Sequence, residues 1–154
     1  MLLILIQYMI IIGRADKADF PELFLRDISI KIDTGAYTST IHSHDIREEV
    51  VDGEKYIEFR VLDPDHPMYT GQLFRTKKYK RKEVRNSFGI SELRFVVDTS
   101  IILFGNEYPL ELSLSERSDM RYPILIGRKL LKKRFVVDPS KKDISYKQKK
   151  KSKK

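Results

Sequence analysis

Apolar and polar residues alternate with a period of two over several stretches of this chain, which constrains the fold more than any other feature. The alternation runs through residues 28–33, 57–61 and 110–114. Successive side chains of a strand point to opposite faces, so each stretch predicts a strand with one buried face. Residues 93–104 are rich in β-branched and aromatic residues and predict one or two further strands.

Turn signals separate these predicted strands, at Asp52-Gly53, residues 63–67, Phe88-Gly89 and Gly105-Asn106. One short helix is expected over residues 128–134, which contain no helix breaker, and a last strand over residues 135–139. Many short strands with regular turns and one late helix are typical of an all-β barrel or sandwich.

Composition fits one soluble domain followed by a tail. The chain has 154 residues, 41% hydrophobic, and no cysteine, which excludes disulfides and thiolate metal ligands and fits a reducing compartment such as the cytoplasm. Residues 141–154 hold eight lysines and one aspartate, so they account for nearly all of the net charge of +8. We therefore predict a folded domain over residues 1–140 and a disordered, solubilising tail over residues 141–154.

Two other segments have unusual composition. Residues 75–85 contain seven arginines and lysines and one glutamate, which predicts a surface loop or hairpin able to attract acidic peptide. Met1 to Ile12 are apolar except for Gln7, which is short of the roughly 20 residues that a membrane-spanning helix needs. A buried first strand is the favoured interpretation of this start, and a membrane anchor or uncleaved export signal is the alternative.

The triplet Asp33-Thr34-Gly35 directly follows an alternating strand, and this arrangement is the main candidate for chemistry. The strand delivers a carboxylate to the loop at its end, and glycine lets the backbone turn closely around it. The threonine hydroxyl can hydrogen-bond across an interface. Residues 123–131 form a second element, an apolar strand that enters the turn Gly127-Arg128 and then a helix.

Together the two elements resemble the retropepsin family of aspartic proteases. More narrowly, the chain resembles small bacterial retropepsin-like proteins labelled "ATP-dependent zinc protease", which are associated with glutamate ligases of the RimK type. The resemblance covers most of the chain and is carried by residues 12–14, Leu23 after Pro21-Glu22, residues 31–42, 84–87, 114–120 and 124–131.

The resemblance implies a closed acid-protease barrel in which Asp33 is the catalytic aspartate and Thr34 and Gly35 are its supporting loop. It implies supporting or substrate-binding roles for Ala36, Thr38, Ser39, His42, Gly127 and Arg128. One chain carries one such triplet, so the family logic requires a homodimer in which two Asp33 carboxylates share a proton and activate a water. No metal or cofactor is expected, and no motif for ATP binding is visible.

Two positions and the flap depart from the family pattern. Retropepsins usually have an aspartate at the position of Tyr37, where it pairs with the arginine equivalent to Arg128, and Asn or Asp at the position of Lys129. Arg128 must therefore find another partner, for which Asp45, Asp119 and a backbone carbonyl are the candidates. The flap that covers substrate is assigned either to residues 68–72 or to the basic run after them.

Other candidate sites have simpler interpretations. His42, His44 and Asp45 form a cluster that the zinc label invites as a metal site, but zinc needs three or four ligands, and His66 lies in a separate loop. Arg117-Ser118-Asp119 is expected to form a salt-bridge network, with a peptide-binding rim as the alternative.

Three functions remain open at this stage. The first is a homodimeric aspartic endopeptidase acting on a peptide or protein. The second is a non-catalytic binding or regulatory module of the same fold, acting with a RimK-type ligase or a ribosomal protein. The third, a nucleic-acid-binding barrel, is not expected, because no aromatic residues are clearly interleaved with the arginines.

Overall fold

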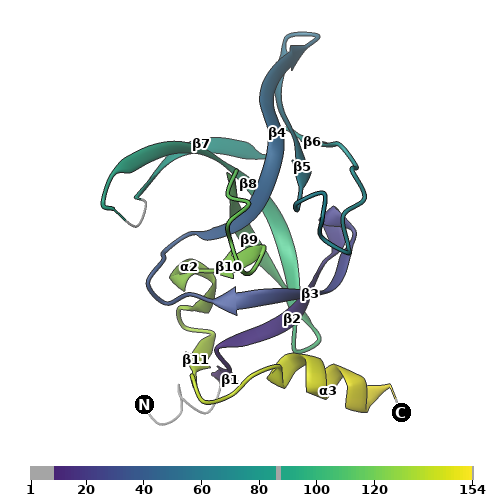
Figure 1. Ribbon diagram of the computed structural model, residues 1–154, viewed down its shortest axis with the longest axis vertical. Coiled ribbons are helices and arrows are strands. Elements are labelled where there is room, and N and C mark those ends of the chain that lie inside the picture. Colours follow the sequence, from purple (N-terminus) through teal and green to yellow (C-terminus); the bar gives the residue numbers. More distant parts are fainter. Residues whose placement is uncertain (1–8, 86–87, 154) are drawn as a thin grey trace.

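The computed structural model of the protein describes residues 9–85 and 88–153 (Figure 1). It is built mainly from strands: β1 Ile10–Ile12, β2 Ala15–Phe20, β3 Leu25–Ile32, β4 Ser39–Val51, β5 Glu54–Val61, β6 Phe74–Thr76, β7 Tyr79–Arg85, β8 Ser91–Leu103, β9 Asn106–Ser115, β10 Ile124–Ile126 and β11 Phe135–Val137. The helices are a 3-10 turn at Pro21–Leu23, α2 at Arg128–Leu131 and α3 at Ile144–Ser152.

Strands from all parts of the chain close into a ring. They are hydrogen-bonded in the order β10-β3-β2-β8-β9-β4, and β10 also pairs with β4. The alternation found in the sequence explains the packing, because the apolar residues of β3 point inward and Arg26 and Lys31 point outward. Ile28 and Ile30 of β3 are almost completely buried, and so are Ile41, Leu112 and Ile124 from the other strands of the ring.

Two hairpins extend from this ring (Figure 1). The long strands β4 and β5 continue past the ring, turn at Asp52-Gly53 and carry β6 along their edge. Strands β7 and β8 form a second hairpin, with Phe88, Gly89 and Ile90 near its tip. The predicted turns at Asp52-Gly53 and Phe88-Gly89 are confirmed.

The end of the chain differs from the expectations. Helix α2 ends at Leu131, three residues earlier than predicted, because Lys132 leaves the helical conformation with ψ at 126°. Residues Ile144–Ser152 form helix α3, where the lysine-rich composition predicted a disordered tail. The helix packs on β2, and its Lys149 Nζ lies 2.9 Å from an Asp19 carboxylate oxygen and 2.6 Å from one of Asp27.

The apolar start of the chain is described from residue 9 onward. Ile10–Ile12 form β1, which pairs in parallel with β11, in agreement with the predicted first strand over these residues. The remainder of that prediction, residues 1–8, lies outside the described residues. Within the described ranges, none of the helices has the length and the apolar composition that crossing a bilayer requires.

Candidate active site

Asp33 stands at the end of β3, where the chain leaves the ring. Its backbone N–H donates to the Ile126 carbonyl at 2.8 Å, which ties the start of the loop to β10. Its side-chain Oδ1 accepts a hydrogen bond of 3.0 Å from the Gly35 N–H. Thr34 and Gly35 are exposed, so the loop presents this carboxylate at the surface of a single chain.

The β10–α2 connection clamps this loop from behind. The N–H groups of Arg128 and Lys129 donate to the carbonyls of Ala36 and Tyr37, at 2.8 and 2.9 Å. The approach leaves no room for a side chain at Gly127, where an added Cβ would lie 2.6 Å from the Tyr37 carbonyl oxygen. The two segments singled out in the sequence are therefore joined directly.

Of the three partners considered for Arg128, namely Asp45, Asp119 and a backbone carbonyl, the structure shows the backbone carbonyl. Its Nη1 donates to the Thr34 carbonyl oxygen at 2.9 Å, and its guanidinium carbon lies 5.8 Å from the centre of the Tyr37 ring. Asp45 pairs instead with Arg60, and Asp119 lies 3.9 Å from Arg117. Tyr37 thus replaces a carboxylate with an aromatic face, which can still hold a cation.

The other residues proposed as site supports lie beside or behind the loop. Ser39 is buried, and its Oγ accepts a hydrogen bond of 3.0 Å from the Gly127 N–H. Thr38 is also buried, and the Ala36 N–H donates to the Asp33 carbonyl at 3.3 Å. His42 lies further along β4, where its Nδ1 accepts a hydrogen bond of 3.0 Å from the Arg117 N–H. It therefore fixes the 115–119 loop rather than the Asp33 loop.

The histidine cluster is dispersed by the fold. His44 Nδ1 lies 3.2 Å from Asp45, and its ring stacks on Tyr69, whereas His42 Nε2 lies 4.0 Å from Asp63. Within residues 9–85 and 88–153, no three His, Asp or Glu side chains gather into a group that could hold a metal ion.

The basic run of residues 75–85 lies on β6, β7 and the turn between them, and much of its charge is neutralised. Glutamates of β4, β5 and β9 face it, and each of four cations contacts one of them: Arg75 with Glu58, Lys77 with Glu54, Lys80 with Glu111 and Arg81 with Glu48. The hydrogen bonds from Arg75 and Arg47 hold the pKa of Glu58 below its usual range, against the burial that raises it. The run therefore stabilises the hairpins and leaves few cations available for an acidic peptide.

Glu111 connects this network to the site, since its carboxylate also accepts a hydrogen bond of 2.7 Å from Lys129 Nζ. Burial alone would raise the pKa of Glu111, but the hydrogen bonds and attraction of Lys129 and Lys80 lower it from 4.5 to about 2. Because the pKa of Glu111 is lower in the folded state than in the unfolded state, its ionisation stabilises the fold. This contribution is fully present at pH values above the unfolded pKa and is lost as pH falls through the folded pKa.

We expect Glu111→Gln to lower the free energy of unfolding at pH 7 by about 2 kcal/mol. The loss should shrink between pH 4.5 and about pH 2, where the wild-type carboxylate takes up its proton. Urea unfolding at several pH values measures this, with Glu107→Gln as the control, because Glu107 is exposed on the same strand. If Glu111→Gln lowered the free energy of unfolding equally at pH 7 and pH 2, the ion pairs of Glu111 would not be the source of the stabilisation.

One neighbour of the site was not anticipated from the sequence. The Nζ of Lys82, on β7, lies 5.4 Å from the centre of the Tyr37 ring, so the β7–β8 hairpin contacts the end of the Asp33 loop. Near its tip Phe88 is 86% exposed, Ile90 62% and Leu93 64%. The Phe88-Gly89 turn signalled this hairpin in the sequence, but only the fold brings Lys82 of β7 to Tyr37. Residues 68–72, the other flap candidate, pack against the β4–β5 hairpin through Tyr69 and through Gly71, whose carbonyl accepts from Arg60.

Known proteins share this sequence and this fold. The RimB-like family, described as retropepsin-like aspartic endopeptidase RimB, matches residues 11–148 and so runs past the predicted boundary at residue 140 into α3. Probable alpha-L-glutamate ligases of Shewanella pealeana and Desulfotalea psychrophila are each 34% identical to the chain over 134 residues. That match covers 84% of this chain and 28% of each ligase, so the chain spans just over a quarter of these curated relatives.

A solved structure is similar over nearly its whole length. The crystal structure of a protein of unknown function from Legionella pneumophila superposes with a TM-score of 0.70 at 26% identity. The superposition covers 88% of this chain and 98% of that one.

Proposed function

The chain belongs to the RimB-like family of retropepsin-like aspartic endopeptidases, and from that premise we propose that it hydrolyses peptide bonds as a homodimer. The observation that carries the proposal is the loop in which Asp33, at the surface, is held by Gly35 and clamped by the β10–α2 connection. Hydrogen bonds hold the loop on both sides and its carboxylate is accessible, as a group that must meet both substrate and a second subunit requires.

The proposed mechanism uses two copies of Asp33, one from each subunit, facing each other across a two-fold axis. Two carboxylates at such a distance cannot both ionise, so they share one proton, as in aspartic proteases generally. The ionised carboxylate removes a proton from a bound water, which attacks the peptide carbonyl carbon. The protonated one donates to the carbonyl oxygen, which gives a tetrahedral diol. The carboxylate that took the water's proton then passes it to the leaving nitrogen as the C–N bond breaks, and the other carboxylate takes back a hydroxyl proton as the carbonyl reforms.

A surface suited to the second subunit is formed by the strands β1 and β11. Ile11 and Val136 are direct neighbours in their parallel register and are 51% and 42% exposed, while Ile12 and Phe135 beside them are buried. In the described part of the chain this sheet has two strands, so each strand has one edge free to pair. An exposed apolar pair beside free strand edges supports a self-complementary interface.

We expect Val136→Asp to convert the dimer to a monomer at micromolar concentration, because symmetry brings two added carboxylates into one apolar interface. The dimer dissociation constant should rise on the order of 100-fold, which corresponds to a few kcal/mol. Sedimentation equilibrium measures it. Val50→Asp is the matched control, since Val50 is 64% exposed at the end of β4. An equal change in both variants, or a wild type that is strictly monomeric, would contradict the interface.

The β7–β8 hairpin is the segment that we propose as the flap. The Lys82–Tyr37 contact joins it to the end of the Asp33 loop, and the exposed side chains near its tip offer apolar contacts to a bound peptide. A hollow of about 540 Å³ lies between Phe88, Arg94 and the 115–119 loop, and is open to an extended chain. The sequence left two flap candidates, residues 68–72 and the basic run after them. These contacts favour the basic run.

The proposed partners follow from the curated relatives. In proteins named probable alpha-L-glutamate ligase, a segment related to this chain occupies 28% of the length. We therefore propose that the chain acts alongside a glutamate ligase of the RimK type, on the ligase or on a protein such as a ribosomal protein that it modifies. In the non-catalytic alternative the chain would bind the same partners, but this binding would not require the Asp33 carboxylate.

The deciding experiment is a peptide-cleavage screen of the wild-type chain against Asp33→Asn, with the fold of both checked by circular dichroism. Hydrolysis that requires the Asp33 carboxylate supports the peptidase. A wild type that binds a glutamate ligase but cleaves none of its products or subunits would favour the regulatory module.

A further inference from the structure

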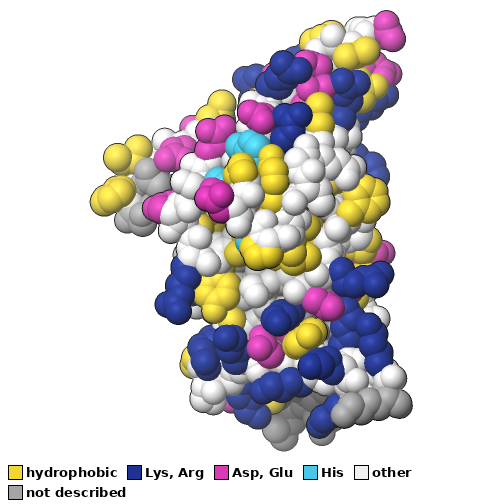
Figure 2. Space-filling model, turned by 45° about the vertical axis from the view of Figure 1, so that its right-hand side comes forward, with side chains coloured by type: hydrophobic (Ala, Val, Ile, Leu, Met, Phe, Trp, Pro, Cys, Tyr) yellow, Lys and Arg dark blue, Asp and Glu magenta, His cyan; other side chains and the backbone are white. Residues whose placement is uncertain are grey.

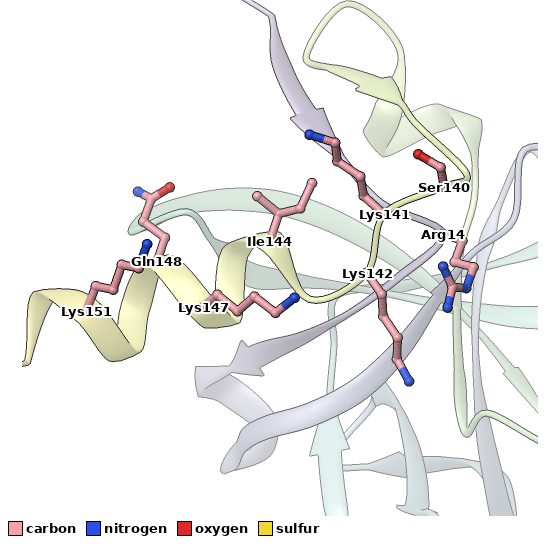
Figure 3. A pocket seen from close by; sticks show the side chains of 8 residues that line it. All are labelled: Arg14, Ser140, Lys141, Lys142, Ile144, Lys147, Gln148 and Lys151. Atoms are coloured by element: carbon pink, nitrogen blue, oxygen red, sulfur yellow. The ribbon is translucent and has the colours of Figure 1, made fainter.

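Helix α3 and the segment before it present cationic side chains around an open hollow. Ile144, Lys147, Gln148 and Lys151 recur at helical spacing on one face, Lys141 and Lys142 precede them, and Arg14 comes from the β1–β2 connection (Figure 3). With Ser140 they line a hollow of about 690 Å³. We call this surface the lysine hollow.

The opposite face of α3 anchors the helix to the sheet. The buried Asp16 carboxylate accepts hydrogen bonds from the Ser145 and Tyr146 N–H groups, at 2.9 and 3.1 Å. Lys149 Nζ contacts Asp19 and Asp27. The lysines of α3 therefore lie on two faces. Lys149 anchors the helix to the sheet, and Lys147 and Lys151 line the lysine hollow.

The segment before the helix is also fixed. The Arg14 N–H donates to the Lys141 carbonyl at 2.9 Å, and the Asp143 N–H donates to the Ala15 carbonyl at 2.9 Å. The backbones approach so closely that a Cβ on Gly13 would lie 2.3 Å from the Lys141 carbonyl oxygen. Because both walls of the lysine hollow are held by the backbone, the surface is formed before any ligand binds.

The charges of the lysine hollow are offset only weakly, by the attraction between Lys141 and Asp138, which adds to the Ser140 hydrogen bonds in lowering the pKa of Asp138. In the part of the chain that the structure describes, Arg14, Lys141, Lys142, Lys147 and Lys151 have no carboxylate at ion-pair distance. This separates them from the cations of β6 and β7, which face glutamates. Figure 2 shows Lys and Arg side chains gathered over the lower end of the molecule, where α3 lies. Like charges held together on an ordered surface attract a polyanion.

We propose that the lysine hollow binds a single-stranded nucleic acid through its phosphate backbone. Of the side chains that line it, Ile144 is the one large apolar group, so it offers no set of pockets for the side chains of a docked peptide. The face has no apolar stripe to enter a lipid surface, which an interfacial helix requires. Lysine point charges suit phosphates, and a hollow admits a flexible strand.

Nucleic acid was not expected from the sequence because no aromatic residues are clearly interleaved with the arginines, and the lysines of residues 141–154 were assigned to a disordered tail. The ordered helix changes that assignment. It spaces Lys147 and Lys151 one turn apart and brings them beside Arg14, more than a hundred residues away in the chain. Binding through these residues does not involve the Asp33 carboxylate and is independent of peptide hydrolysis.

The test replaces Lys142, Lys147 and Lys151 together by Gln in the full chain. Fluorescence anisotropy with labelled oligouridylate should show affinity reduced about tenfold or more, and the slope of log affinity against log salt should become shallower by about 2. These lysines make none of the contacts that anchor α3, so the helix should remain. The triple Lys→Arg variant keeps the charges and should bind like wild type, which guards against loss of binding through misfolding.

A triple variant of Lys55, Lys132 and Lys133 to Gln is the matched control, because it removes the same charge from exposed lysines that do not line the lysine hollow. It should bind oligouridylate like wild type, and oligodeoxythymidylate should compete for the site. Equal weakening by the two Gln variants would show a general charge effect and overturn the proposal. Tighter binding of oligoglutamate, binding to phosphatidylglycerol vesicles alone, or no binding of oligouridylate would overturn it as well.

Discussion

Replacement of Asp33 by Asn is expected to abolish peptide hydrolysis while leaving the fold intact. The change removes both the general base and the general acid, since each subunit contributes the same carboxylate to the proposed pair. General acid–base groups typically contribute 10²–10⁴-fold to a rate, so a loss on the order of 10³-fold or more is expected. The Asn side chain keeps an oxygen able to accept the Gly35 N–H bond, and so the loop should keep its shape.

The matched control is Asp52→Asn, at the tip of the β4–β5 hairpin. Asp52 has a positive φ of 51°, which asparagine tolerates well, so this variant makes the same chemical change away from the site. Rates should be compared for preparations of equal unfolding midpoint and equal dimer content. A peptidase activity that survives in Asp33→Asn would assign hydrolysis to other residues or to a contaminant.

The central part of the fold was predictable because its determinants are local. Period-two alternation over residues 28–33 places Ile28, Ile30 and Ile32 on the inside of β3, which delivers Asp33 to a surface loop. Glycine at position 127 marks a close backbone approach, and the approach is to the Asp33 loop. The resemblance to retropepsins implies that these two segments pack together, and their backbones are hydrogen-bonded to each other.

The end of the chain was not predictable because its contacts are distant in sequence. Helix α3 has little apolar surface of its own, and its composition alone indicates disorder. Its anchors, Asp16, Asp19 and Asp27, lie 122 to 130 residues away from their partners in α3. The same reason applies to the basic run of residues 75–85, because only the topology brings Glu48 and Glu111 opposite it.

The clamp behind the Asp33 loop leads to the second large effect, in which Gly127→Ala destabilises the protein by about 3 kcal/mol. The backbone at Gly127 has a φ of −94°, which alanine adopts without strain, so the effect is entirely one of space. An added Cβ would lie 2.6 Å from the Tyr37 carbonyl oxygen and 2.9 Å from that of Ala36. These are backbone atoms within the hydrogen-bonded clamp, and they cannot move without lengthening the bonds to Arg128 and Lys129.

Guanidinium unfolding of Gly127→Ala should show the lost stability as a lower midpoint at unchanged slope. The rate of hydrolysis should also fall at denaturant concentrations too low to unfold the variant, because the Asp33 loop is displaced. Gly53→Ala is the control. Gly53 has nothing within 4 Å of its Cβ position but a positive φ of 79°, so alanine there adds only backbone strain of about 1 kcal/mol. The steric clamp is supported if Gly127→Ala is clearly the more damaging of the two and also lowers hydrolysis. If the two variants are equally stable and equally active, the β10–α2 connection does not hold the Asp33 loop as described, and a different support must position the carboxylate.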